Sequence, residues 1–176
     1  MGSKKTFSLF LSLCLFSCGS DSNLDLDSEP TQIYDNEIKN PKINIYQQHN
    51  MVVQSTSNKL LKNDGEDATL VGNVIAKFFN DDGNYISTLY SDSAIVENIS
   101  NNLRAYGNVK VISDSGYTLL SDQINWDKQY KLITSKDSVT LTDKSNTTVM
   151  GVGFESDMDL TNYKIFKFIG SFEDSK

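Results

Sequence analysis

The sequence predicts an all-β fold for most of the chain, and three observations indicate it. From Ile43 onward, short runs rich in Val, Ile, Thr, Tyr and Phe alternate with breaks of Asn, Asp and Gly, which are strand and turn signals. In two of these runs apolar residues take every second position, the period of a half-buried strand. Similar segments then recur along the chain. Repeated hairpins must stack or fold over to bury their apolar faces, so a jelly roll, an open barrel and a β-solenoid are the candidates.

The N-terminal segment, residues 1–17, has the layout of a secretory signal peptide. Lys4 and Lys5 form a positive region, residues 7–16 an apolar run, and Ser17 places a small residue before Cys18. The run is about half the ~20 residues that a membrane-spanning helix needs. We therefore expect this segment to be removed.

Cys18 is the expected lipidation site. The stretch "LFSC" resembles the lipobox of bacterial lipoproteins, in which cleavage leaves the cysteine as an acylated N-terminus. Acyl anchoring becomes stable with two or more chains, which this modification supplies. A plain signal peptide with an incidental cysteine, or a Cys14–Cys18 disulfide, is the alternative, although Cys14 lies in the part to be removed.

Residues 18–42 are mostly polar and acidic, and they predict a flexible tether that follows the lipidated N-terminus. Residues 43–176 are then one β domain. Loss of Lys4 and Lys5 changes the net charge from −7 to −9. Nucleic acid requires an extended basic surface, so the expected partners include no nucleic acid.

Two segments within the domain, 68–78 and 103–111, alternate most clearly. Turn residues follow each segment, "NDDGN" at 80–84 and "SDSGY" at 113–117, and predict hairpins. Ile124 and Trp126 share one parity on the next predicted strand, where Trp126 is expected to be a core or rim aromatic. The predicted interior face is Leu70, Val74, Ala76, Phe78, Leu103, Ala105, Val109, Val111, Ile124 and Trp126, with Asn73, Lys77, Asn108 and Lys110 outside.

The repeat has two parts, a Gly-Asn-Val element and a Ser-Asp step. Gly-Asn-Val begins at Gly72 and again at Gly107, and Ser-Asp occurs at 91–92 and 121–122. A weaker third copy covers 133–141 and ends in Ser156-Asp157. The glycines of "GVGFES" (151–156) lack the lysine of a phosphate loop and predict a strand bend or a close backbone contact.

The residues offer little for catalysis or metal binding. His49 is the only histidine and Cys18 the only cysteine after cleavage, so a zinc cluster or Cys-His dyad has no ligands. The carboxylates lie in expected turns, and no suitably placed glutamate completes a calcium loop. We expect no catalytic residues, no metal and no cofactor.

Residues from about 43 to 170 resemble the LptC family of periplasmic lipopolysaccharide-export proteins, which is related to the LptA/OstA-like β-jelly-roll proteins. The resemblance lies in "LVGNVIAKFFNDDG", "STLYSD", "LRAYGNVKVISDSGYTLLSDQINWD" and "MGVGFESDMDL". It implies an open β-jelly roll with an apolar interior. Many members of that family begin with a transmembrane helix, where this chain has a lipobox.

The resemblance also implies a function and partners. The interior would accept the acyl chains of lipid A, part of lipopolysaccharide, from an inner-membrane ABC transporter and pass them to an LptA-like periplasmic bridge protein. The predicted interior face would be the lipid-binding surface. The protein would be periplasmic and held at a membrane by its N-terminal lipid; the family favours the inner membrane, and the outer membrane is the alternative. Strand edges near 43–53 and 163–172 would meet the partners, the second through Ile165, Phe166, Phe168 and Ile169.

Two other functions fit parts of the sequence. A structural or adhesive cell-envelope lipoprotein would have a core tightly packed by Phe78, Val109 and Ile124, with no lipid cargo. An envelope enzyme that acts on glycans would need two carboxylates about 5 to 9.5 Å apart in a cleft, and no pattern here gathers them.

Overall fold

The computed structural model describes residues 34–173, which form β-strands and no helix. The predicted all-β fold is confirmed. Cys18 and the predicted signal peptide lie outside the described residues. The strands are β1 (Asn36–Lys39), β2 (Lys42–Gln47), β3 (Asn50–Thr56), β4 (Lys59–Lys62), β5 (Ala68–Phe79), β6 (Tyr85–Val96), β7 (Leu103–Ser113), β8 (Thr118–Asp127), β9 (Leu132–Thr142), β10 (Thr147–Asp157) and β11 (Tyr163–Glu173).

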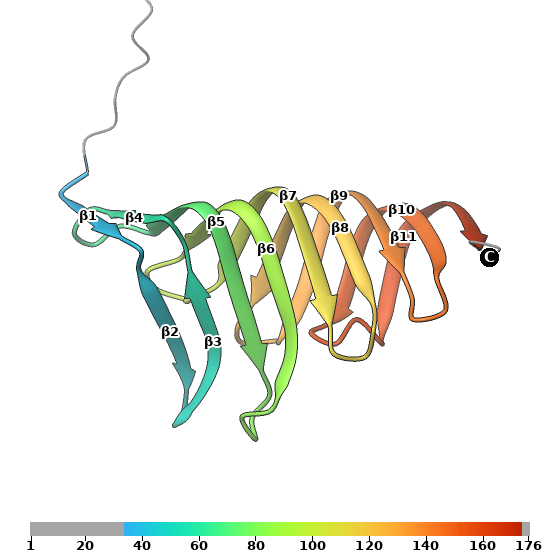
Figure 1. Cartoon of the computed structure of the whole chain (residues 1–176), viewed down its shortest axis with the longest axis horizontal. Helices are drawn as coiled ribbons and strands as arrows, with labels where there is room; N and C mark the ends of the chain where they lie inside the picture. Colours follow the sequence, from blue (N-terminus) through green and yellow to red (C-terminus); the bar gives the residue numbers. More distant parts are fainter. Residues whose placement is uncertain (1–33, 174–176) are drawn as a thin grey trace, which may run out of the picture. The chain divides into compact units, whose positions relative to one another are not determined.

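The strands form one antiparallel sheet in which spatial order follows chain order. From β5 to β11, each strand pairs with the strand before it and the strand after it. The short strands are halves of longer ones: β3 and β4 both lie along β5, while β2 pairs with β3 and β1 with β4. Figure 1 shows this meander running from blue to red. The pairing of β1 places ordered structure inside residues 18–42, so the folded domain begins earlier than the predicted boundary at Ile43.

The long strands bend near their middle, along a line that we call the corner. In β5 the ladder is interrupted between Val71 and Val74, where Gly72 and Asn73 have φ of 76° and 49°. In β7 the same happens at Gly107 and Asn108, with φ of 74° and 47°. Two left-handed residues opposite one residue of the neighbouring strand make a bulge that bends the strand. The repeated Gly-Asn-Val element is therefore the corner.

On β6 and β8, which lie beside the bulged strands, a serine hydroxyl forms a hydrogen bond at the corner. Ser91 Oγ donates to the Ser93 carbonyl at 3.0 Å, and Ser121 Oγ donates to the Gln123 carbonyl at 3.1 Å. These bonds satisfy backbone acceptors where the ladder is broken. The Ser-Asp repeat thus marks the same line across the sheet.

The bend folds the sheet into two layers with the core between them. The inward-facing residues on both sides of the corner are buried in one continuous cluster. The residues predicted to face outward, Asn73, Lys77, Asn108 and Lys110, are exposed. An apolar sheet face stays dry only when another layer covers it. The predicted inward and outward faces are thus confirmed, and the fold is the open β-jelly roll. The inner residues include Leu70, Val74, Ala76, Phe78, Leu103, Ala105, Val109, Val111, Ile124 and Trp126, each at most 3% exposed.

The predicted turns and the glycine pair are also confirmed. In the 80–84 turn, Asn80 Oδ1 accepts hydrogen bonds from the backbone N–H groups of Asp82 and Asn84, at 3.0 and 2.9 Å. In β10, a Cβ on Gly151 would overlap the side chain of Ile165 and lie 2.6 Å from the Lys167 carbonyl oxygen on β11. The glycine at 151 is therefore a close backbone contact, as the sequence predicted.

Candidate functional site

The side of the fold opposite the corner is where the two layers end in loops, and we call it the mouth. Loops 80–84 and 114–117 end one layer, and loops 128–131 and 158–162 end the other. Lys131 Nζ lies 2.6 Å from Asp81 Oδ2, and Ser115 Oγ donates to the Asp159 carbonyl at 3.0 Å. Both contacts join loops of opposite layers, so they hold the mouth together.

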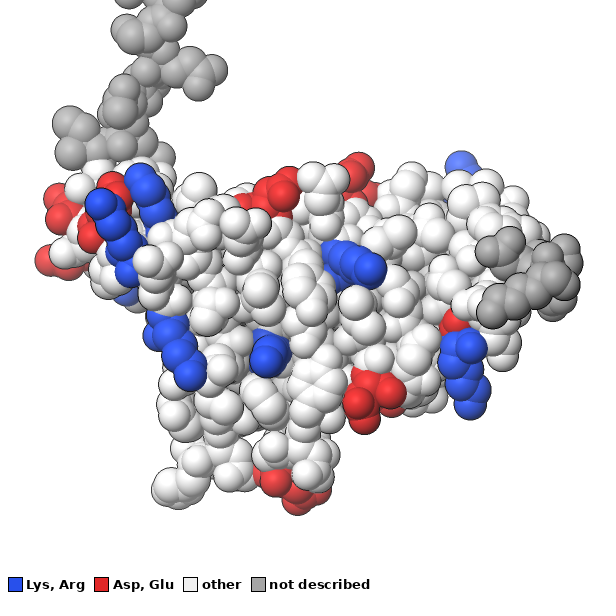
Figure 2. Space-filling view, viewed as in Figure 1, with Lys and Arg blue, Asp and Glu red and all other residues white. Residues whose placement is uncertain are grey.

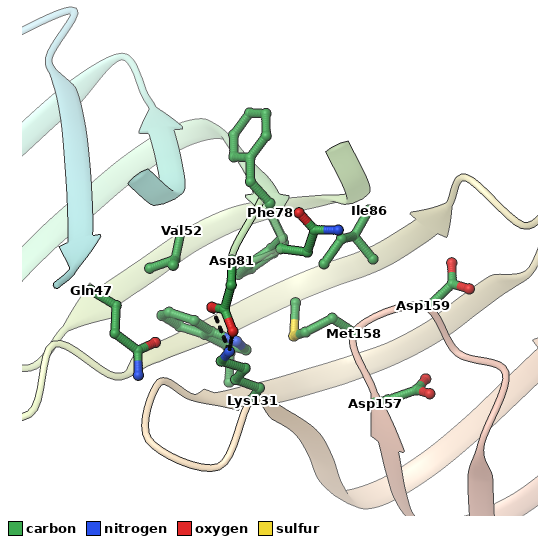
Figure 3. Close-up of a pocket in the computed structure, with 12 residues that line it drawn as sticks. Gln47, Val52, Phe78, Asp81, Ile86, Lys131, Asp157, Met158 and Asp159 are labelled. Carbon is green, nitrogen blue, oxygen red and sulfur yellow. Dashed lines mark hydrogen bonds and ion pairs between the residues drawn. The ribbon is translucent and has the colours of Figure 1, made fainter. Parts of the chain in front are cut away.

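A cavity of about 240 Å³ lies between the layers at the mouth (Figure 3). Its wall is mostly apolar and combines side chains from β3, β5, β6, β8 and the 158–162 loop. The rings of Phe78 and Trp126 pack at its inner end, with centroids 5.2 Å apart and planes inclined by 57°. The lining side chains used below are Gln47, Val52, Phe78, Ile86, Trp126 and Met158, with Asp81 and Lys131 at the polar rim.

Two polar atoms in this wall lack hydrogen-bond partners within residues 34–173. Trp126 is 3% exposed, and its Nε1–H is buried without an acceptor. The side-chain oxygen of Gln47, at the end of β2, is buried without a donor. Buried polar groups in folded proteins nearly always have partners, so a donor and an acceptor left over in one cavity point to a ligand or water there.

The loop between β10 and β11 closes part of the mouth. Met158 is 7% exposed and Leu160 is fully buried, so both side chains extend into the interior. Asp157 holds the loop: its carboxylate accepts from the Thr161 backbone N–H at 3.1 Å and from Asn162 Nδ2 at 2.7 Å. Figure 3 draws Met158 across the cavity from Gln47 and Val52.

The predicted lipid-binding residues divide into two groups. Phe78 and Trp126 line the cavity. The other eight are packed in the core, as with Val109 at 1% exposure and Ile124 at 0%. Sequence reasoning missed Gln47, Val52, Ile86 and Met158 as cavity residues, because strand parity reports only the inward face and not the end of the layer at which a residue lies. The Asp81–Lys131 pair joins residues far apart in the chain and left no local signal.

The strand predicted to meet a partner, 163–172, is β11 at the end of the sheet. Within the described residues β11 pairs with β10 alone. Ile165 is half-buried against the core, whereas Phe166, Phe168 and Ile169 are 59%, 61% and 58% exposed. At the other end the edge is formed by β1 and β2. Val53, inside the range predicted as the N-terminal edge, is instead paired on both sides, with β2 and with β5.

The face seen in Figure 2 carries charged side chains of both signs, scattered among uncharged ones. Several basic groups lie close together at the left end of this view, next to acidic ones, and the other basic groups stand apart. Residues 34–173 contain no group of three or more His, Cys, Asp or Glu side chains placed to hold a metal ion. The same residues include no helix long and apolar enough to span a membrane.

Comparison with known proteins gives one family and a similar fold. The model of the OstA-like protein family matches residues 42–171. A crystal structure of LptH from Pseudomonas aeruginosa, described as the LptA homologous periplasmic component of the conserved lipopolysaccharide transport device, has a TM-score of 0.54. The match has 11% sequence identity and covers 70% of this chain and 88% of LptH, which establishes a shared fold. No curated protein matches the chain.

Proposed function

The chain belongs to the OstA-like protein family, and from this membership we propose that it is a periplasmic component of lipopolysaccharide transport. The shared fold with LptH, itself described as such a component, supports the proposal. More narrowly, we assign it the role of an LptC-type protein that accepts lipid A acyl chains from an inner-membrane ABC transporter and passes them to an LptA-like bridge protein.

The observation that carries this proposal is the position of the cavity. It lies between the two layers at the mouth, and its apolar wall is continuous with the core. Each methylene exposed to water costs about 0.8 kcal/mol, so a multi-chain amphiphile crosses water slowly. An apolar interior removes that barrier without covalent chemistry, and the energy for transport would come from the partner ATPase.

The two ends of the sheet supply the means of transfer. Exposed strand edges carry unpaired N–H and C=O groups that accept another strand. The β1–β2 edge follows directly on the tether and would meet the transporter. The β11 edge, with exposed Phe166, Phe168 and Ile169, would meet the bridge protein and join the two apolar interiors.

The N-terminal region would hold the protein at a membrane. In this proposal residues 1–17 are removed, Cys18 carries the lipid, and the following polar residues give the domain its reach. The inner membrane is the membrane of residence in this scheme, because that is where the ABC transporter lies.

A second function is favoured by one observation. Phe78, Val109 and Ile124 are at most 1% exposed, which is the tightly packed core expected of a structural or adhesive β-repeat lipoprotein without cargo. The two functions differ in whether the layers separate to admit lipid.

Site-specific photocrosslinking distinguishes them. A benzophenone side chain placed at Phe78 or Val109 should capture lipopolysaccharide, and one at Lys110 should not, because Lys110 follows Val109 on β7 but faces outward. Equal capture at Lys110, or no capture at Phe78 and Val109 in a folded protein, would contradict the carrier role and support the structural one.

A further inference from the structure

The cavity at the mouth combines an apolar wall with an unpaired donor and an unpaired acceptor. The donor is the indole Nε1–H of Trp126 and the acceptor is the amide oxygen of Gln47. They come from β8 and β2, strands at a distance in the sheet, and the fold brings both to the wall of one cavity. Leaving such groups unpaired in a buried site is unfavourable, so a ligand that pairs with both would gain affinity.

One chemical group matches both atoms at once. A hydroxyl accepts one hydrogen bond through its oxygen and donates another through its hydrogen. A methylene chain satisfies neither atom, and an ester or ketone can satisfy only the donor. The surrounding Val52, Phe78 and Met158 side chains require the rest of the ligand to be apolar.

The volume limits what part of a ligand enters. Pockets that bury a drug-sized molecule usually measure about 300–1,000 Å³. At about 240 Å³ this cavity takes a segment of one chain rather than a whole multi-chain lipid. The ion pair of Asp81 and Lys131 lies at the rim, between Gln47 and Met158 in the view of Figure 3, and leaves the polar end of a ligand facing solvent.

We infer that this cavity is a selective site for a hydroxylated acyl chain, in which Trp126 Nε1–H donates to the hydroxyl oxygen and Gln47 Oε1 accepts its hydrogen. The inference rests on the proposed function and deepens it: Trp126 and Gln47 become the residues that select among acyl chains. The competing occupant is an ordered water, which offers the same donor and acceptor.

Calorimetry with neutral single-chain probes tests the inference on the full chain. The probes are methyl decanoate and its 3-hydroxy and 10-hydroxy forms, chosen because they avoid the charges of Asp81 and Lys131. We expect at least one hydroxylated ester to bind about three- to tenfold more tightly than methyl decanoate, the range expected for one net hydrogen bond. Since Trp126 is the only tryptophan of the chain, its fluorescence should change on binding and place the probe in this cavity.

Three variants locate the selectivity. Trp126→Phe retains an aromatic ring against Phe78 but removes the donor, and Gln47→Leu removes the acceptor. Each should abolish the preference, so that the hydroxylated ester and methyl decanoate bind the variant with equal affinity. Gln129→Leu, at an exposed loop position outside the cavity, is the matched control and should keep the preference.

The outcomes separate this inference from the proposed function. Equal affinities for the plain and hydroxylated esters, or a preference that survives in both cavity variants, overturns the inference. If no ester changes the Trp126 fluorescence while lipopolysaccharide is still captured at Val109, the cavity holds water only. The inference then fails and the proposed function stands. Loss of capture at Phe78 and Val109 overturns the function itself.

Discussion

Gly107 is the residue on which the corner of β7 most clearly depends. Its φ of 74° lies in the left-handed region, and a Cβ built there would lie 2.6 Å from Asp92 Oδ2 on β6. The Asp92 carboxylate in turn accepts from Asn108 Nδ2 at 2.7 Å. The corner of β7 is therefore a glycine with a carboxylate packed over it, and at Gly72 the side-chain amide of Asn58 takes the equivalent position.

Gly107→Ala should lower the free energy of unfolding by more than the cost of placing alanine in the left-handed backbone conformation. The backbone term is about 1–2 kcal/mol, and displacement of Asp92 adds to it. Gly65→Ala is the matched control, because Gly65 has φ of 77° but no described atom within 4 Å of its ideal Cβ position. Urea denaturation of both variants measures the difference.

The double variant Gly107→Ala/Asp92→Ala should recover part of the loss, because the clash is removed and only the backbone term remains. Equal destabilisation by Gly107→Ala and Gly65→Ala would mean that the Asp92 contact contributes nothing.

At the scale of the strand, the sequence predicted where strands and turns lie but not how the strands bend. Alternating parity gave the inner faces of β5 and β7 correctly because the inward residues on the two sides of each corner, such as Leu70 and Val74, still have the same parity. For the same reason parity contained no sign of the bend. The repeated Gly-Asn-Val element could be seen in the sequence, but only the φ angles show that the strands bend there.

The candidate site was less accessible to sequence reasoning. Trp126 was assigned correctly to the core or rim, and Phe78 to the interior. Their contact across the layers, and the approach of Lys131 to Asp81, depend on how far the sheet folds over. The angle between the two layers is set by the corners of several strands together, so no local sequence pattern predicts it.

The Asp81–Lys131 pair should control opening of the mouth more than stability. Both side chains are largely exposed, at 68% and 43%, and exposed ion pairs contribute about 0–1 kcal/mol. Asp81→Asn should therefore change the free energy of unfolding little but speed entry of an acyl probe, measured by stopped-flow change in Trp126 fluorescence.

Glu37→Gln is the control for this experiment, since it breaks an exposed pair with Lys59, at 3.0 Å, between β1 and β4. It should leave the entry rate unchanged, and the reversed pair Asp81→Lys/Lys131→Asp should restore the slower rate. An entry rate that Asp81→Asn does not alter would rule out a gating role for the pair.

Truncation after Leu160 removes β11 and tests the edge as a docking surface. We expect the β-sheet signal in circular dichroism and the capture of lipopolysaccharide to survive, while transfer to the bridge protein stops. Continued transfer would refute docking through β11, and unfolding would assign β11 to the core instead.

Serine replacements at Phe166, Phe168 and Ile169 keep β11 in place and supply the second test. These three side chains are more than half exposed, so the fold should tolerate the change, while transfer should weaken if they contact the partner.

At the scale of the whole molecule, function depends on where the domain is held. Cys18→Ser should prevent acylation and release the protein from the membrane fraction, which fractionation and mass spectrometry of the N-terminal peptide measure. Cys14→Ser, in the segment expected to be removed, should leave membrane association intact. Membrane association of Cys18→Ser without any lipid would show that another part of the protein provides the anchor.

The meander has a consequence for how such a molecule changes in evolution. In the described residues, each bent strand is bonded to the strands next to it in chain order, with no crossover that fixes their number. Tandem duplication of one hairpin, such as β7–β8, would add two strands and about 10 Å of sheet width. The new hairpin would bring its own Gly-Asn and Ser-Asp positions, so the cross-section would stay constant. The reach of the protein is thus adjustable in fixed increments, without redesign of any existing residue.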